Sequence, residues 1–125
     1  RRVLKNGGRF LCSTYGKQHM WEITDLVQQF HKEIVLSAEV LYERFGLENG
    51  ENLLAPYFPE IQMRRYEDAI EIAEAEPLIS YILSCHGNQN QLLLNQYKEF
   101  REFVSARVAD GFHITKDAGI FLCRK

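Results

Sequence analysis

Thr14, Tyr15 and His19 are the side chains whose types and spacing best suit chemistry in this sequence. Their two hydroxyls can donate or accept hydrogen bonds, and the imidazole can act as a general base near neutral pH when a substrate proton lies within reach. Met20 and Trp21 follow in the same loop. The alternative is structural: His19 caps the following helix, and Met20 and Trp21 pack into the helical segment beyond it.

Other chemical constellations find little support. The remaining three histidines are far apart and lack ligand-like spacing, which argues against a metal site. Ser80 and Ser84 flank no glycine elbow, and the adjacent pair Cys85-His86 does not place a thiol and an imidazole face to face on a helix. The sequence therefore predicts neither nucleophilic hydrolysis nor a catalytic dyad.

Length and composition indicate one globular domain. The chain has 125 residues, of which 46% are hydrophobic and 26% are charged. A net charge of −2 with interleaved acids and bases gives no basic stripe, which argues against a nucleic acid partner. The longest apolar stretches, such as Leu78–Leu83, are much shorter than the roughly 20 residues of a membrane span, so we expect a cytoplasmic protein without membrane contact. The three cysteines are predicted to be plain buried thiols.

The first half of the chain predicts a turn, a strand and three helices. Asn and Gly in 5–8 signal a tight turn, and 9–15 is a run of β-formers typical of a strand covered on both faces. Apolar residues at helical spacing predict a helix over about 20–31. Ser37 suits the N-cap of a second helix that Gly46 ends in the left-handed conformation, and a third, short helix follows from Asn49 to about Pro59.

The second half predicts strands on either side of two further helices. Alternation indicates strands over 61–66 and 69–73, the second being an edge guarded by Glu71 and Glu74. Pro77 suits the first position of a helix that runs to about Cys85, and the longest helix extends from about Leu93 to a stop at Gly111. Two closing strands, 112–115 and 119–123, are predicted on either side of a turn at 116–118.

The opening segment carries a recognisable motif. Arg2-Val3-Leu4-Lys5-Asn6-Gly7-Gly8-Arg9-Phe10-Leu11 resembles the R-V-L-K-P-G-G-x-h-h signature (h, an apolar residue) that precedes the fifth strand of class I S-adenosylmethionine-dependent methyltransferases. Asn6 replaces the usual Pro and keeps the turn chemistry. The remainder is similar to the C-terminal half of the type 11 group, with an Asn-Gly-Glu run before Tyr-Phe-Pro, a sixth strand ending at Asp68 and a closing strand Gly119–Cys123.

This resemblance implies an α/β fold in which residues 1–125 are the C-terminal fragment of a doubly wound, seven-stranded sheet. The chain then holds strands five to seven, and strand 9–15 lies beside a closing antiparallel strand. Residues 17–58 form a helical insert that acts as a substrate lid. Tyr42, Phe45 and Tyr57 are candidates for its aromatic lining, and the alternative is that each belongs to the core. Because the carboxyl end of strand five faces the ligand crevice of such sheets, the implied substrate-binding residues are Thr14, Tyr15, His19, Met20 and Trp21.

The cofactor implied is S-adenosylmethionine, but its binding elements are missing from the sequence. The family holds it with a glycine-rich loop after strand one and an acid after strand two, whereas Gly7-Gly8 precede a strand. The chain also opens at Arg1 as though in the last turn of a helix. We therefore expect part of a methyltransferase that acts on a small-molecule acceptor, with the fragment itself inactive and devoid of catalytic or cofactor-binding residues.

A free-standing α+β interaction module is the alternative reading. In either case strand 9–15 is expected to leave one edge unpaired, which predicts a homodimer or a swapped dimer through that edge.

Overall fold

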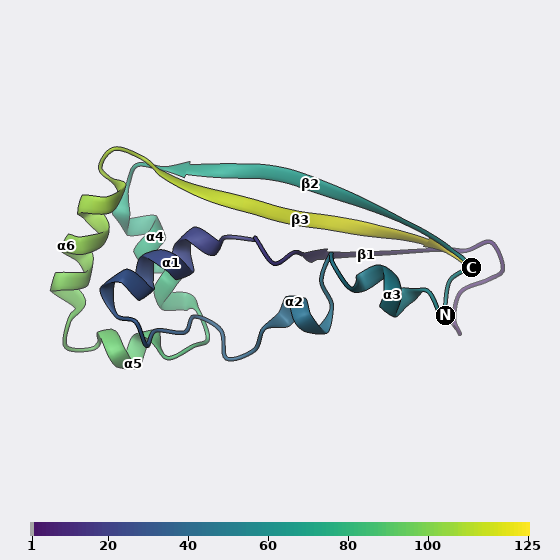
Figure 1. The fold of residues 1–125 in the computed structure, drawn as a ribbon, viewed down its shortest axis with the longest axis horizontal. Helices are drawn as coiled ribbons and strands as arrows, with labels where there is room; N and C mark the ends of the chain where they lie inside the picture. The colour runs from purple at the N-terminus through teal and green to yellow at the C-terminus, as the bar shows by residue number, and fades with distance from the viewer. Residues whose placement is uncertain (1) are drawn as a thin grey trace. The chain divides into compact units, whose positions relative to one another are not determined.

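The computed structural model describes residues 2–125, and within them the chain forms three strands and six helices (Figure 1). The fold is α/β with an antiparallel sheet. The residues divide into two compact units. The sheet unit comprises the described residues up to His19 with Val40–Asp68 and Lys116–Lys125, and the helical unit comprises Met20–Glu39 and Ala69–Thr115. Arg1, where the expected helix end begins, lies outside the described residues.

The last strand of the chain lies between the other two. The strands are β1 (Arg9–Tyr15), β2 (Glu60–Ile72) and β3 (Phe112–Arg124), in the order β1-β3-β2. β1 pairs antiparallel with β3, from Arg9 opposite Arg124 to Tyr15 opposite Ala118. The prediction that strand 9–15 lies beside a closing antiparallel strand is confirmed.

The turn before β1 is tied to the end of the chain. Gly7 has a φ of 76°, which glycine adopts without steric cost, and its amide donates to the Lys125 carbonyl at 3.0 Å. The Lys125 amide donates to the Gly8 carbonyl at 3.0 Å, and the Gly8 amide donates to the Lys5 carbonyl at 2.9 Å. The predicted turn over 5–8 is confirmed, and both glycine amides are occupied.

The two strand pairs predicted in the second half are each one continuous strand. β2 joins the strands predicted over 61–66 and 69–73 without interruption at Glu67-Asp68 and ends at Ile72, because exposed charges are tolerated on an edge strand. In β3 the predicted turn at 116–118 is extended backbone. Along β3 the buried residues are Ile114, then Asp117, and then every second residue to Cys123. The alternation of buried and less buried residues therefore breaks between Ile114 and Asp117, and in the sequence this break resembles a turn.

Four helices belong to the helical unit: α1 (Trp21–Phe30), α4 (Ala75–Ser84), α5 (Gln89–Leu93) and α6 (Tyr97–Val108). α6 packs against α1 and α4, and their apolar faces form one core. The fully buried residues at its centre include Val27, Ile82, Phe100 and Val104. The helix predicted over about 20–31 is confirmed to within one residue. None of the described helices has the length and apolarity that crossing a membrane requires.

The longest predicted helix is α6, which begins at Tyr97 rather than near Leu93. The polar stretch before it, for which no element was predicted, contains α5, which is anchored by the fully buried Gln89: its side-chain nitrogen donates to the Cys85 carbonyl at 2.5 Å, and its side-chain oxygen accepts from the Gly87 amide at 3.1 Å. Gly111, with φ 97°, follows α6 as predicted. Pro77 is the third residue of α4 rather than the first, a position that still lacks an intrahelical N–H partner.

The sheet unit contains the two remaining helices, α2 (Leu41–Arg44) and α3 (Gly50–Leu54), and its own core around Phe58 and Phe121. Both helices are shorter than predicted. Ser37 is not an N-cap: its hydroxyl donates to the Glu39 carbonyl at 2.7 Å, and no positive φ occurs at Gly46. Residues 17–58, expected as one helical insert, are distributed over both units.

Candidate functional site

A group of polar side chains meets where β1 ends. We name it the His19 cluster; it consists of Tyr15, His19, Glu48, Arg65 and Asp117, all in the sheet unit. β1 ends at the buried Gly16, whose amide donates to the Asp117 carbonyl at 2.8 Å. A Cβ at Gly16 would lie 2.7 Å from a Glu48 carboxylate oxygen and would also meet the Asp117 carboxylate, so any larger residue at position 16 would displace these two side chains.

Asp117 is the centre of this cluster and is only 7% exposed. A buried carboxylate requires a compensating partner, and Arg65 on β2 supplies one, with its Nε 3.2 Å from the Asp117 carboxylate. The same guanidinium lies 3.5 Å from Glu48, which also accepts from the Lys17 amide at 3.0 Å. The charges thus hold the segment after β1, the strand β2 and the strand β3 together.

His19 is held in one protonation state by this arrangement. Its Nδ1 accepts the backbone amide of Asp117 at 3.0 Å, and its ring stacks on Tyr15 with 5.1 Å between centroids. Burial and the positive charge of Lys116 lower the pKa of His19, although the Asp117 carboxylate acts in the opposite direction. The ring is therefore neutral near pH 7 with its proton on Nε2, and it offers a hydrogen-bond donor rather than the general base expected from the sequence.

The other predicted site residues lie elsewhere. The Thr14 hydroxyl is used in the fold, because it donates to the Phe45 carbonyl at 2.7 Å. Met20 and Trp21 belong to the helical unit. Met20 precedes α1 in the left-handed conformation with φ 56°, and its amide donates to the Thr115 carbonyl at 2.8 Å. Trp21 is 49% exposed and lines a separate cavity.

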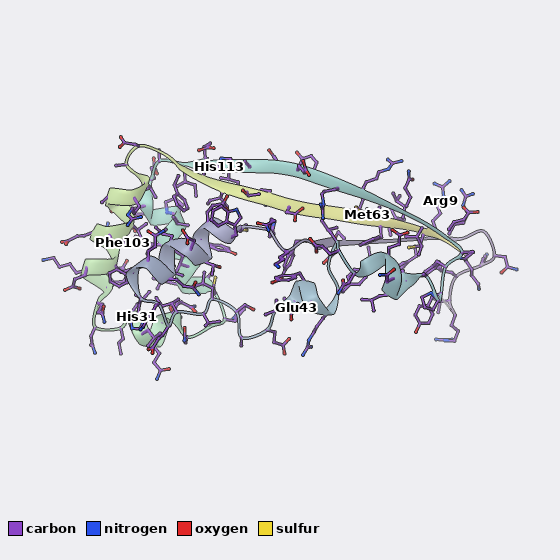
Figure 2. All side chains as sticks on the ribbon, viewed as in Figure 1. Arg9, His31, Glu43, Met63, Phe103 and His113 are labelled. Carbon is purple, nitrogen blue, oxygen red and sulfur yellow. The ribbon has the colours of Figure 1, made fainter. Side chains whose placement is uncertain are left out.

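The aromatic lining predicted for the lid is only partly realised. Tyr42 lines a shallow hollow of about 260 Å³ in the sheet unit together with Lys17, Glu48 and Glu43, the last of which is labelled in Figure 2. Phe45 packs instead on Phe121, with ring centroids 5.6 Å apart. Tyr57 is 58% exposed and lines none of the cavities described.

Asp117, Arg65 and Glu48 were missed by the sequence reasoning. One signal was available: Asp117 is the only acid in the run from Ile114 to Cys123, and apolar residues follow it to the end of that run. A carboxylate inside a buried strand implies a cationic partner, but the sequence alone does not say which arginine supplies it.

Among the described residues, no group of three or more His, Cys, Asp or Glu side chains is arranged to hold a metal ion. No protein-family model matches this chain, and no curated protein matches it either. The arrangement of the His19 cluster therefore has to be interpreted from its own geometry. It offers an imidazole N–H and a phenol beside an ion pair, groups that can form hydrogen bonds with a small polar molecule.

Proposed function

We propose that this chain is the C-terminal part of a class I S-adenosylmethionine-dependent methyltransferase. In this proposal the whole protein transfers a methyl group to a small-molecule acceptor, and residues 1–125 supply strands five to seven of its doubly wound sheet. The chain alone is inactive. The sequence motif from Arg2 to Leu11, which contains the Gly7-Gly8 turn, suggests the family. The strand order is the observation that carries the proposal.

The strand order agrees with what the motif implies. A closing strand that lies antiparallel between its two predecessors is the expected end of such a sheet, and β3 lies between β1 and β2. The remaining strands of the sheet would join at the free edge of β1. The composition of β3 supports a covered sheet, because Ala118, Ile120 and Leu122 are apolar like the buried residues between them.

The described residues do not form a site for S-adenosylmethionine. A glycine-rich loop binds such ligands through free backbone amides after a strand. Here the Gly7 and Gly8 amides already donate to Lys125 and Lys5, and the turn precedes β1. We therefore derive no step through the donor and assign its binding to polypeptide outside residues 1–125.

In this proposal the residues of this chain bind and orient the methyl acceptor. Methyl transfer needs chiefly alignment of the acceptor and exclusion of water, so a donor such as His19 Nε2–H can orient a substrate without itself exchanging a proton. Tyr15, whose ring stacks on that of His19, offers its phenol hydroxyl as a second hydrogen-bonding group. The Asp117–Arg65 pair positions both through the backbone of β3.

Calorimetric titration with S-adenosylmethionine tests the proposal. The complete gene product that carries these residues should bind the donor, S-adenosylhomocysteine should displace it, and labelled methyl should appear in a small-molecule fraction. The 125-residue chain should give no binding heat. The proposal is overturned if the complete product fails to bind the donor or if the 125-residue chain binds it alone.

The second candidate function is a protein-interaction module that associates through β1. One observation favours it: Leu11, in the middle of this edge strand, is 53% exposed. Such an edge invites a strand of a second copy, giving a homodimer or a swapped dimer. Light scattering during size-exclusion chromatography should then detect a dimer, and a stable monomer at high concentration contradicts this function.

A further inference from the structure

A separate cavity of about 280 Å³ lies within the helical unit, at the start of α1. Its apolar walls are the Trp21 indole, Leu26 and Phe112. Trp21 is the only tryptophan in the sequence and is 49% exposed. A half-exposed indole on the wall of a cavity offers a flat apolar surface on which a small ligand can pack.

Glu22 places a fixed negative charge on the wall of this cavity. The Thr115 amide lies 3.0 and 2.9 Å from its two carboxylate oxygens, and the Thr115 hydroxyl donates to one of them. Burial raises the pKa of Glu22, but the hydrogen bonds from Thr115 outweigh it and hold this pKa below its ordinary value. The carboxylate is therefore charged at neutral pH, and its orientation is fixed.

Asp25 adds a second carboxylate one turn further along α1. The one cation on the cavity wall, Arg107, offsets part of this negative charge; its guanidinium donates to the side-chain amide oxygen of Gln29 and lies 4.8 Å from the centre of the Phe103 ring. Gln29 in turn donates to Asp25 at 2.7 Å. The cavity thus combines an indole face with two carboxylates and one guanidinium, so its walls carry more negative than positive charge.

We propose that this cavity binds a small organic ammonium ion, whose apolar body packs on Trp21 and whose charged nitrogen lies between Glu22 and Asp25. A tryptophan face attracts a cation through its π electrons, and carboxylates at the same wall attract it further. A bare metal ion would leave the indole uncovered, and the excess of negative charge on the walls disfavours an anion. The inference rests on the cavity alone and needs neither the methyl donor nor the proposed function.

Tryptophan fluorescence of the 125-residue chain measures this binding directly, since Trp21 is its sole tryptophan. The probes are 2-phenylethylamine, the neutral isostere 2-phenylethanol and the anion phenylacetate. We expect the amine to bind roughly tenfold more tightly than the alcohol, as one charged contact and one cation–π contact together predict. Phenylacetate should be the weakest. Equal affinities for amine and alcohol overturn the proposal.

Asp25→Asn removes one charge from the cavity and should reduce the preference for the amine to less than about threefold. Glu102→Gln, on the exposed face of α6, removes one charge from the same unit and should leave the preference unchanged. An unaltered preference in Asp25→Asn contradicts the site. If circular dichroism shows that Asp25→Asn is unfolded, binding of the two probes to the wild-type chain at increasing salt concentration tests the site instead. Salt should weaken the binding of the amine and leave that of the alcohol unchanged, and equal salt dependence contradicts the site.

Discussion

The two outer strands of the sheet, β1 and β2, differ in how their edges are protected. β2 carries charged side chains along its whole length, namely Glu60, Arg64, Arg65, Glu67, Asp68 and Glu71. β1 carries one charge, Arg9 at its start, followed by six uncharged residues. Charged residues on an edge strand prevent association with other strands. This difference indicates that β2 ends the sheet, and it favours the proposal that β1 pairs with further polypeptide.

Substitutions in the central strand β3 should lower the free energy of unfolding more than substitutions in either outer strand. Phe121 is fully buried and packs on Phe45, so Phe121→Ala should lower the free energy of unfolding by about 3–5 kcal/mol. Met63→Ala on β2, where the side chain is 37% exposed, should cost less than about 1 kcal/mol. Urea denaturation measures both. Similar costs at the two positions contradict the description of β3 as the buried centre.

A lysine in each outer strand tests the comparison directly. Leu11→Lys on β1 should weaken self-association roughly ten- to a hundredfold, because it removes about 1.5–3 kcal/mol of apolar burial and places a charge in the pairing edge. Ile70→Lys on β2, 40% exposed, should leave association unchanged. Sedimentation equilibrium compares the two variants. If Ile70→Lys dissociates the assembly and Leu11→Lys does not, the assignment of the open edge is wrong.

The ion pair that links β2 to β3 in the His19 cluster should have an intermediate effect. Asp117→Asn leaves Arg65 without its most buried partner and should cost about 1–2 kcal/mol, a value reduced by the partial exposure of Arg65. Glu48→Gln removes the longer and more exposed contact of the same arginine, and should cost less than about 0.5 kcal/mol. Thermal unfolding with both variants provides the measurement, and equal losses would indicate that burial of Asp117 contributes nothing.

Parts of this fold were predictable because local signals agree with the tertiary structure. The apolar stripe of α1, the glycines at 7 and 111 and the β-formers of β1 each specify their conformation through neighbouring residues. β2 and β3 were predicted as four strands because their alternation changes along their length. That change depends on which core each half contacts, and local sequence does not contain it.

The candidate site was predictable only where it follows a strand end. Tyr15 and His19 were found from their position after the run 9–15, and the structure stacks them. Asp117, Arg65 and Glu48 come from three other segments, so their meeting depends on the β1-β3-β2 order. The role of His19 also changed, because its partner is a backbone amide, which sequence cannot identify.

The smallest predicted effect is the opposite titration of two histidines, His113 on β3 and His19 in the segment after β1. His113 is exposed and pairs with Glu71 on β2; hydrogen bonding to this carboxylate raises the pKa of His113, although desolvation acts in the opposite direction. Its stabilising contribution is present below about pH 6.5, the value of an unperturbed histidine, and is lost as pH rises through the folded pKa. For His19, whose pKa is lowered mainly by burial, stability is instead lost as pH falls through about 6.5.

NMR titration of the imidazole nitrogens separates the two groups. The His113 midpoint should lie above about 6.5 and return towards it in Glu71→Gln, whereas the His19 midpoint should lie below about 6.5 and stay there in that variant. The same spectra should show the His19 proton on Nε2, because Nδ1 accepts from the Asp117 amide. A proton on Nδ1 would remove the donor on which acceptor binding at this cluster depends, even if every strand of the sheet is placed correctly.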